Sequence, residues 1–205
     1  MSLNNEFLLR VADLFAENGA KTLTMDDIAK EFSMSKKTLY QQYKNKEDLL
    51  TEVLDYKLDL IIETLLLNDS KSDNAIERMF LRESDFENVA RTNKTIFIRQ
   101  LIKYYPSIYN LHILSIDEKV SKIVIHNIKL GREQGLYRSD FDERLYVKFL
   151  LQLMFSYENS PLFENQTCDR GTFCFEAMVF YIHSIATIDG KKFLSEFNFK
   201  HQKKI

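Results

Sequence analysis

The chain has 205 residues, of which 45% are hydrophobic and 28% are charged, and its formal net charge is -2. This composition suits a packed core and excludes a disordered chain, and the near-neutral charge excludes a protein that is basic over its whole surface. Five glycines and two prolines are few for this length. Sheets need more of both residues in their turns, so the composition favours long helices.

The predicted helices follow from apolar residues at helical spacing and from polar residues that cap the helix starts. They cover residues 5–18, 24–32, 35–43, 45–67, 74–92, 95–104, 116–133, 143–157 and 172–188. Pro106 and the segments 131–142 and 159–170 are the main breaks between them. No strand pattern and no internal repeat competes with this interpretation. We therefore predict an all-α fold of three short helices followed by a larger bundle.

The cysteines and the apolar segments limit where the protein works. Cys168 and Cys174 form neither a disulfide framework nor a CxxC metal pair, which indicates a reducing compartment. The first residues do not resemble a signal peptide, and the longest apolar run, 145–155, is interrupted by Lys148 and Gln152. We expect a cytoplasmic protein with no membrane partner.

The second and third helices, 24–32 and 35–43, have the lengths and the short connection of a helix-turn-helix. In such a motif the second helix turns one face to the core and the other to the major groove of DNA. If Leu39 is at the centre of the buried face, the 100° step per residue puts Lys37 and Gln41 on the opposite face. The spacing therefore predicts that residues 35–43 read DNA.

Local charge supports this interpretation. Lys36 and Lys37 lie in the first turn of the predicted reading helix, where the helix dipole disfavours cations by roughly 0.3–1 kcal/mol each. Four lysines and no acid occur between Ser33 and Lys46. A nearby phosphate backbone would turn this cost into a benefit. The alternatives are a solvated basic turn, or an all-helical binding protein whose basic turn meets an acidic partner other than DNA. Only a duplex binder should lose affinity steeply with salt and prefer one palindrome.

Three segments resemble the N-terminal domain of TetR-family transcriptional regulators: FAENG at 15–19, TLTMDDIA at 22–29 and MSKKTLYQQYKNKEDLL at 34–50. The resemblance is continuous over about residues 6–50, and residues 131–140 resemble a Gly-x-x-x-Gly turn of many members. It implies a helix-turn-helix domain at 1–48 and a helical effector-binding and dimerisation domain at 49–205. It also implies a homodimer that binds a palindromic DNA operator, most often as a repressor, and leaves it when a small-molecule effector binds.

The resemblance assigns DNA contacts to nine positions, of which five are phosphate positions and four lie nearest base edges. The phosphate positions are Thr24, Ser35, Tyr40, Lys46 and Gln42, where Gln weakens the contact, and the base-edge positions are Lys36, Lys37, Thr38 and Gln41. Lys suits guanine, Gln suits adenine, and the Thr methyl suits thymine. Lys37 stands where the family often has Gly, and Gln42 where an aromatic residue or His is usual. These departures affect the operator sequence and leave the mode of binding unchanged.

The last two predicted helices resemble the pair that forms a four-helix bundle with its symmetry mate. Their apolar residues, expected at the dimer interface, are Tyr146, Phe149, Leu150, Leu153, Phe175, Met178, Val179 and Ile182. The alternative is that these faces pack entirely within one subunit. A dimer would place two reading helices one helical turn of DNA apart.

The region 50–135 would enclose the effector. Its candidate pocket residues are Phe86, Phe97, Tyr104, Tyr105, Tyr109 and His126, which would suit an apolar or aromatic molecule. The alternative is that these aromatic side chains are ordinary core residues. Catalysis finds no support, because the four histidines are scattered and no glycine-rich phosphate loop or metal-ligand motif occurs. We expect no enzyme activity, no cofactor and no metal site.

Overall fold

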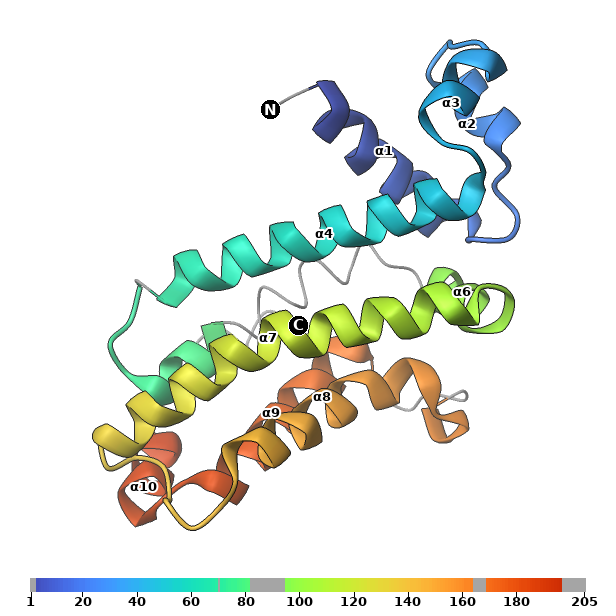
Figure 1. The fold of residues 1–205 in the computed structure, drawn as a ribbon. Coiled ribbons are helices and arrows are strands. Elements are labelled where there is room, and N and C mark those ends of the chain that lie inside the picture. Colours follow the sequence, from blue (N-terminus) through green and yellow to red (C-terminus); the bar gives the residue numbers. More distant parts are fainter. Residues whose placement is uncertain (1–2, 70, 82–94, 164–168, 197–205) are drawn as a thin grey trace.

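The computed structural model describes residues 3–69, 71–81, 95–163 and 169–196 (Figure 1). These residues form helices and no strand, apart from an isolated bridge between Tyr137 and Ala186, which confirms the all-α prediction. The elements are α1 Leu3–Asn18, α2 Met25–Glu31, α3 Lys36–Gln42, α4 Lys46–Asp69, α6 Thr95–Tyr104, α7 Pro106–Glu133, α8 Glu143–Asn159, a 3-10 turn Pro161–Phe163, α9 Arg170–Ile185 and α10 Ile188–Glu196. Residues 75–81 are helical as well.

Two predicted helix boundaries were wrong. The helix expected at 116–133 begins at Pro106, because proline at the first helical position loses no intrahelical hydrogen bond and can start a helix as well as interrupt one. The helix expected at 172–188 ends at Ile185, where Ala186 is extended (φ -74°, ψ 145°), and α10 begins at Ile188. Residues 82–92 of the predicted helix 74–92 lie outside the described residues.

The first of two hydrophobic cores joins α1, α2, α3, the start of α4 and α6. Val11, Phe15, Ile28, Leu39 and Leu49 are fully buried in it. These residues come from each of the first four helices, so the N-terminal helices pack as one unit against the beginning of α4.

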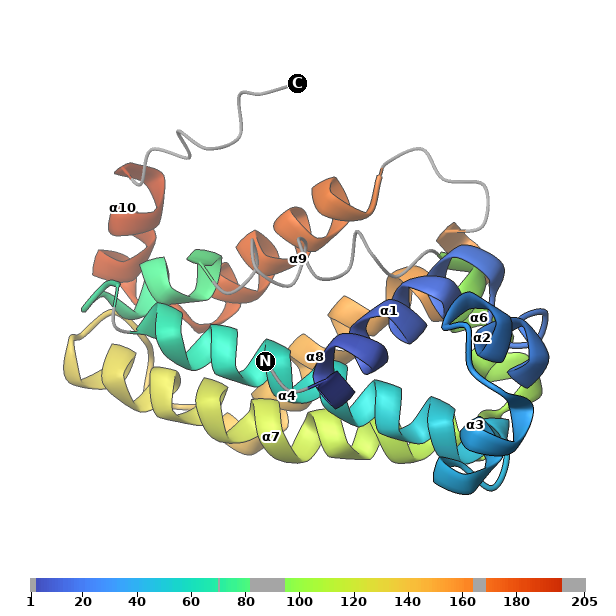
Figure 2. The same cartoon turned by 90° about the horizontal axis from the view of Figure 1, so that it is seen from above.

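The second core is formed by residues 75–80, α7, α8, α9 and α10, with Val124, Val147 and Ile182 among its buried side chains. α4 contributes to both cores, because Leu49 and Leu50 lie in the first and Ile62 packs against the second. The division predicted after residue 48 therefore falls inside a continuous helix. Figures 1 and 2 show α4 and α7 side by side, with α6 at the end that carries α2 and α3 and α10 at the opposite end.

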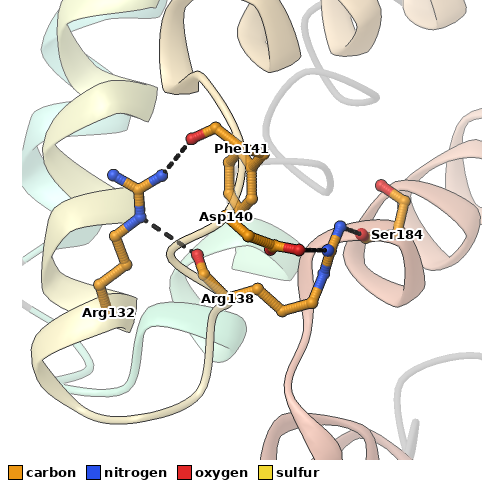
Figure 3. A network of polar contacts seen from close by, with 5 residues as sticks. All are labelled: Arg132, Arg138, Asp140, Phe141 and Ser184. Atoms are coloured by element: carbon orange, nitrogen blue, oxygen red, sulfur yellow. Dashed lines mark hydrogen bonds and ion pairs between the residues drawn. The ribbon is translucent and has the colours of Figure 1, made fainter.

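The turn between α7 and α8 is held by two arginines (Figure 3). Arg132 donates to the carbonyl oxygens of Phe141 (2.7 Å) and Arg138 (3.2 Å). Arg138 bonds Asp140 at 2.7 Å and the carbonyl oxygen of Ser184 in α9 at 2.6 Å. Both guanidinium groups also lie over the Phe141 ring, at 4.7 and 5.7 Å from its centroid. The turn thereby fixes the start of α8 relative to the end of α9.

In the described ranges, no helix is both long enough and apolar enough to cross a membrane. Within the same ranges no group of three or more His, Cys, Asp or Glu side chains is placed to hold a metal ion.

Candidate functional site

α2 begins with a reciprocal pair of hydrogen bonds. Asp27 N donates to Thr24 Oγ1 (3.2 Å), and Thr24 N donates to Asp27 Oδ2 (3.0 Å), which is a capping box. These bonds also hold the pKa of Asp27 below its usual value, because Thr24 donates to the carboxylate from both its hydroxyl and its backbone. Thr24, expected to meet a phosphate, is exposed at this helix start while its hydroxyl is bound to Asp27.

The connection between α2 and α3 is closed by backbone hydrogen bonds. Met34 N donates to Ala29 O at 2.9 Å, and Ser33 adopts a left-handed conformation with φ 50° that reverses the chain. Ser35 then caps α3 by accepting a hydrogen bond from Thr38 N at 3.1 Å. The tight turn and the cap together fix the angle at which α3 leaves α2.

α3 is anchored by one face only. Leu39 is 0% exposed and Tyr43, directly after the helix, is 5% exposed, with its ring stacked on Phe7 at 6.1 Å between centroids. The side chains between these anchors point outward. Of the nine predicted contacts, eight are exposed and only Lys46 is half-buried: Thr24, Ser35, Lys36, Lys37, Thr38, Tyr40, Gln41 and Gln42 form the exposed set.

The charge of this face is more balanced than the sequence indicated. Lys36 forms an ion pair with Asp26 of α2, which raises the pKa of Lys36 and offsets the cost of a cation in the first turn. Residues 33–46 contain no acid, but the fold brings Asp26 of the preceding helix next to Lys36. Lys37 has no ion-pair partner within the part of the chain that the structure describes, so it is the lysine of the first turn that remains available.

The ammonium group of Lys46 already has partners within the protein. Its ammonium donates to the Lys21 carbonyl oxygen at 3.1 Å and lies 6.0 Å from the Phe15 ring and 5.8 Å from the Tyr105 ring. Burial lowers the pKa of this lysine. A phosphate contact by Lys46 would require this ammonium to exchange the carbonyl for the phosphate.

α6 contacts the segment between α1 and α2, which also holds the carbonyl bonded by Lys46. Gln100 Oε1 accepts a hydrogen bond from Lys21 N at 2.7 Å, and the Lys21 ammonium lies 4.0 Å from the centre of the Tyr104 ring. Gly19, with φ +85°, allows this approach, because a Cβ at this position would lie 2.5 Å from Gln100 Oε1. Gln100 was not predicted from the sequence, because helical spacing alone does not say which turn a polar side chain of α6 reaches.

A cavity of about 110 Å³ lies in the second part of the molecule, enclosed by α4, α7, α8, α9 and the helical residues 75–81. It is lined almost entirely by apolar side chains. The lining residues are Leu58, Ile61, Leu65, Met79, His112, Ile116, Val120, Ile123, Val124, Leu150, Leu151, Met154, Phe155, Arg170, Cys174 and Met178.

The residues predicted to line a pocket are placed elsewhere. Phe97 is buried in the first core against Phe15, at 6.0 Å between ring centroids, and Tyr105 and Tyr109 pack on the same core. Tyr104 is 39% exposed and His126 is exposed on the outer side of α7. Phe86 lies outside the described residues. The prediction used aromatic content, whereas the cavity is lined mainly by aliphatic side chains and methionines, for which no aromatic signal exists.

The predicted dimer residues divide into two groups. Leu150, Met178 and Ile182 are buried within the subunit, as the alternative required, and Phe175 packs on Phe80 at 5.7 Å between ring centroids. Val179 is half-buried and packs on the second core. Tyr146, Phe149 and Leu153 lie at the outer face. Phe149 is 48% exposed and Tyr146 and Leu153 line a surface groove between α8 and α9.

Two residues of this outer face were missed by the sequence reasoning. Phe180 is 66% exposed and Leu145 is 48% exposed, although both are large and apolar. Phe180 also lines the groove with Tyr146, Phe149 and Leu153. The helical spacing of α8 and α9 marked the apolar stripes but could not say which stripe faces the rest of the subunit.

Known proteins are similar to this chain in the sequence of its N-terminal helices and in its overall fold. The model of the family described as bacterial regulatory proteins, tetR family, matches residues 11–53, which span the second half of α1, all of α2 and α3 and the start of α4. The HTH-type transcriptional repressor KstR2 of Mycobacterium tuberculosis is 25% identical over 154 residues, 73% of this chain and 76% of that protein. Residues 11–53 therefore match the tetR family of bacterial regulatory proteins, and most of the chain is similar to a transcriptional repressor.

The similarity in fold extends over the whole TetR-family architecture. A TetR transcription regulator from Haloarcula marismortui has a TM-score of 0.75 at 19% identity, covering 91% of this chain and 100% of that chain. The regulator FadR of Bacillus subtilis, solved in complex with stearoyl-CoA, has a TM-score of 0.66 at 19% identity, covering 86% of this chain and 96% of that chain. The predictions of a helix-turn-helix fold and of a resemblance to TetR-family DNA-binding regulators of transcription are confirmed.

Proposed function

We propose that the chain is a homodimeric repressor that binds a palindromic operator through residues 35–43 and releases it when an apolar molecule enters the cavity between α4, α7, α8 and α9. The observation that carries this proposal is the division of α3 into one buried anchor and an exposed polar face. Leu39 and Tyr43 hold the helix, while Lys37, Tyr40 and Gln41 are exposed on it. A helix held in this way can enter the major groove without losing its own packing.

The exposed side chains of α3 have different tasks in this proposal. Lys37, Thr38 and Gln41 have the chemistry for base edges, and Tyr40 and the capped helix start at Ser35 suit phosphates. Lys36 is paired with Asp26, so its contribution to DNA binding depends on the exchange of that partner for phosphate or base. We therefore assign sequence preference chiefly to Lys37 and Gln41.

The outer face of α8 and α9 supports the dimer. Phe149 and Phe180 are large exposed apolar residues on two neighbouring helices, and with Tyr146 and Leu153 they border one groove. A continuous apolar patch on a soluble helical protein marks an interaction surface. If a second copy offers the same face across a two-fold axis, the helices cover each other and two reading helices point the same way.

The surroundings of the cavity support a ligand response. α4 begins directly after the reading helix and carries Leu58, Ile61 and Leu65 into the cavity lining. A ligand that separates α4 from α7 would therefore change the position of α3. The similar proteins include a ketosteroid transcriptional regulator and a regulator solved with stearoyl-CoA, and both a steroid skeleton and a stearoyl chain are apolar.

Selection of bound fragments from a random duplex pool tests DNA binding and operator symmetry together. We expect a palindrome with half-sites one helical turn apart, and an affinity that falls steeply with salt. Gln41→Ala should relax the preference at one position of each half-site, while Tyr40→Phe should weaken all sequences alike. An unchanged preference in the Gln41 variant would remove the assignment of base reading to this residue.

The oligomeric state is tested by sedimentation of the variant Phe180→Asp, with Leu111→Asp as its control. Leu111 is 62% exposed, lies on α7 and does not line the groove of the proposed interface. We expect the Phe180 variant to sediment as a 24.3 kDa monomer and to lose operator affinity, and the Leu111 variant to remain a dimer. A wild-type chain that sediments as a monomer at micromolar concentration would contradict the proposal.

A further inference from the structure

One residue of the cavity wall carries a polar atom without a hydrogen-bond partner among the described residues. His112 of α7 lines the cavity, and its Nδ1 atom is buried with no hydrogen-bond partner in the described part of the chain. A buried nitrogen without a partner costs free energy that folding must offset elsewhere. In a wall made of Leu, Ile, Val and Met side chains, such an atom marks the place where a ligand atom can complete a bond.

His112 is uncharged near neutral pH. Burial, together with the positive charge of Lys119, lowers its pKa to about 4. A neutral imidazole offers one donor and one acceptor nitrogen, and exchange of the ring proton lets Nδ1 take either part. It can accept from a hydroxyl group or donate to a carbonyl group, but it supplies no charge to balance a carboxylate.

The size of the cavity limits the ligand. About 110 Å³ is somewhat less than the roughly 150 Å³ of an engineered apolar cavity that holds benzene. The cavity as it stands therefore admits a single small ring or a short chain, and a larger molecule must widen it. The remaining wall gives little polar contact besides Arg170, which lies at the first residue of α9 and has interactions of its own.

We infer that the effector site recognises an apolar molecule bearing one uncharged oxygen, an alcohol, phenol or ketone, through a hydrogen bond to His112 Nδ1. This inference deepens the proposed function, on which it rests, by naming the chemical class of the effector. The apolar wall supplies affinity through burial, and His112 sets the preference for oxygen over a methyl group. A carboxylate in the same place would lose its hydration without gaining a cation from His112.

Three probes of similar size separate these possibilities: phenol, toluene and benzoate. Their dissociation constants would be measured by titration calorimetry with the full-length protein in the absence of DNA, for the wild type, His112→Leu and His112→Gln. His126→Leu is the matched control, because His126 is exposed on the same helix. Toluene serves as an internal check that the cavity of each variant is intact.

We expect the wild type to bind phenol at least as tightly as toluene and to bind benzoate weakly. His112→Leu should lower the affinity for phenol about tenfold relative to toluene, the size expected for one lost hydrogen bond. The Gln variant should restore most of the preference, and His126→Leu should leave it unchanged. Equal losses of phenol and toluene in the Leu variant, tightest binding of benzoate, or no binding of either neutral probe by the wild type would each overturn the inference.

The DNA experiment distinguishes this failure from a failure of the proposed function. If phenol binds as expected but does not weaken binding to the selected operator, ligand recognition stands and the proposed release fails. If the operator is released by benzoate instead, the proposed function stands and the assignment of an uncharged ligand is wrong.

Discussion

Lowering the pH from about 7 to about 5 should destabilise the folded chain through His112. The pKa of this histidine falls from an ordinary value of 6.5 to about 4 on folding, because burial and Lys119 disfavour the imidazolium ion. Between these values the unfolded chain binds a proton that the folded chain does not bind. The stabilisation by neutral His112 is therefore fully present above the unfolded pKa and is lost as the pH falls towards the folded one. Linkage gives a loss of about 2 kcal/mol over this interval.

Urea unfolding followed by circular dichroism measures this effect, since the chain contains no tryptophan to report by fluorescence. The comparison is between the wild type and His112→Gln at equal protein concentration, because dimer dissociation would otherwise enter the result. His126 and His183 remain in both proteins, so their effects cancel in the difference. The wild type should lose about 2 kcal/mol more than the Gln variant on going from pH 7 to pH 5. Parallel pH profiles would show that His112 is not held neutral by its surroundings.

Four further substitutions test how the helices and turns are packed. Leu39→Ala should cost about 2–5 kcal/mol in unfolding free energy, because the side chain is 0% exposed, and DNA binding should be lost with it. Gly131→Ala should cost about 3 kcal/mol, since its Cβ would lie 2.0 Å from the Tyr137 ring, whereas Gly135→Ala meets no atom within 4 Å and should cost about 1 kcal/mol through its φ of +71°. Urea unfolding measures these three changes in unfolding free energy. Gln100→Ala should accelerate hydrogen exchange at the Lys21 amide, which loses its acceptor, and equal exchange rates would refute that contact.

The sequence was most informative where local chemistry determines structure. Thr24 and Ser35 cap α2 and α3 as their residue types predict, and Leu39 is buried while Lys37 and Gln41 are exposed, as the helical spacing requires. These features depend on residues within a few positions of one another. The start of α7 was missed for the converse reason, because Pro106 fits equally well at a break and at the first position of a helix.

The contacts between distant segments could not be predicted. The pairing of Lys36 with Asp26 and of Lys46 with the Lys21 carbonyl depends on how α2, α3 and α4 cross, which helical spacing does not specify. The cavity lining likewise combines residues from α4, α7, α8 and α9, and it is mainly aliphatic. Aromatic content therefore pointed to the core beneath the helix-turn-helix, where Phe97 packs on Phe15, and not to the cavity.

In the proposed function, the size of the cavity and the positions of the helices that line it connect ligand entry with DNA binding. A molecule larger than a small ring cannot fit in about 110 Å³, so it must move α4 and α7 apart. The N-terminal ends of both helices reach the helix-turn-helix: Lys46 of α4 bonds the Lys21 carbonyl, and Tyr105, directly before α7, lies against the same ammonium. Gln100 of α6 holds the Lys21 amide beside them. The turn before α2 is thus bonded to α4 and to α6, and Tyr105 joins the start of α7 to the same Lys46 ammonium. Separation of α4 from α7 would therefore disturb the segment that orients the reading helix.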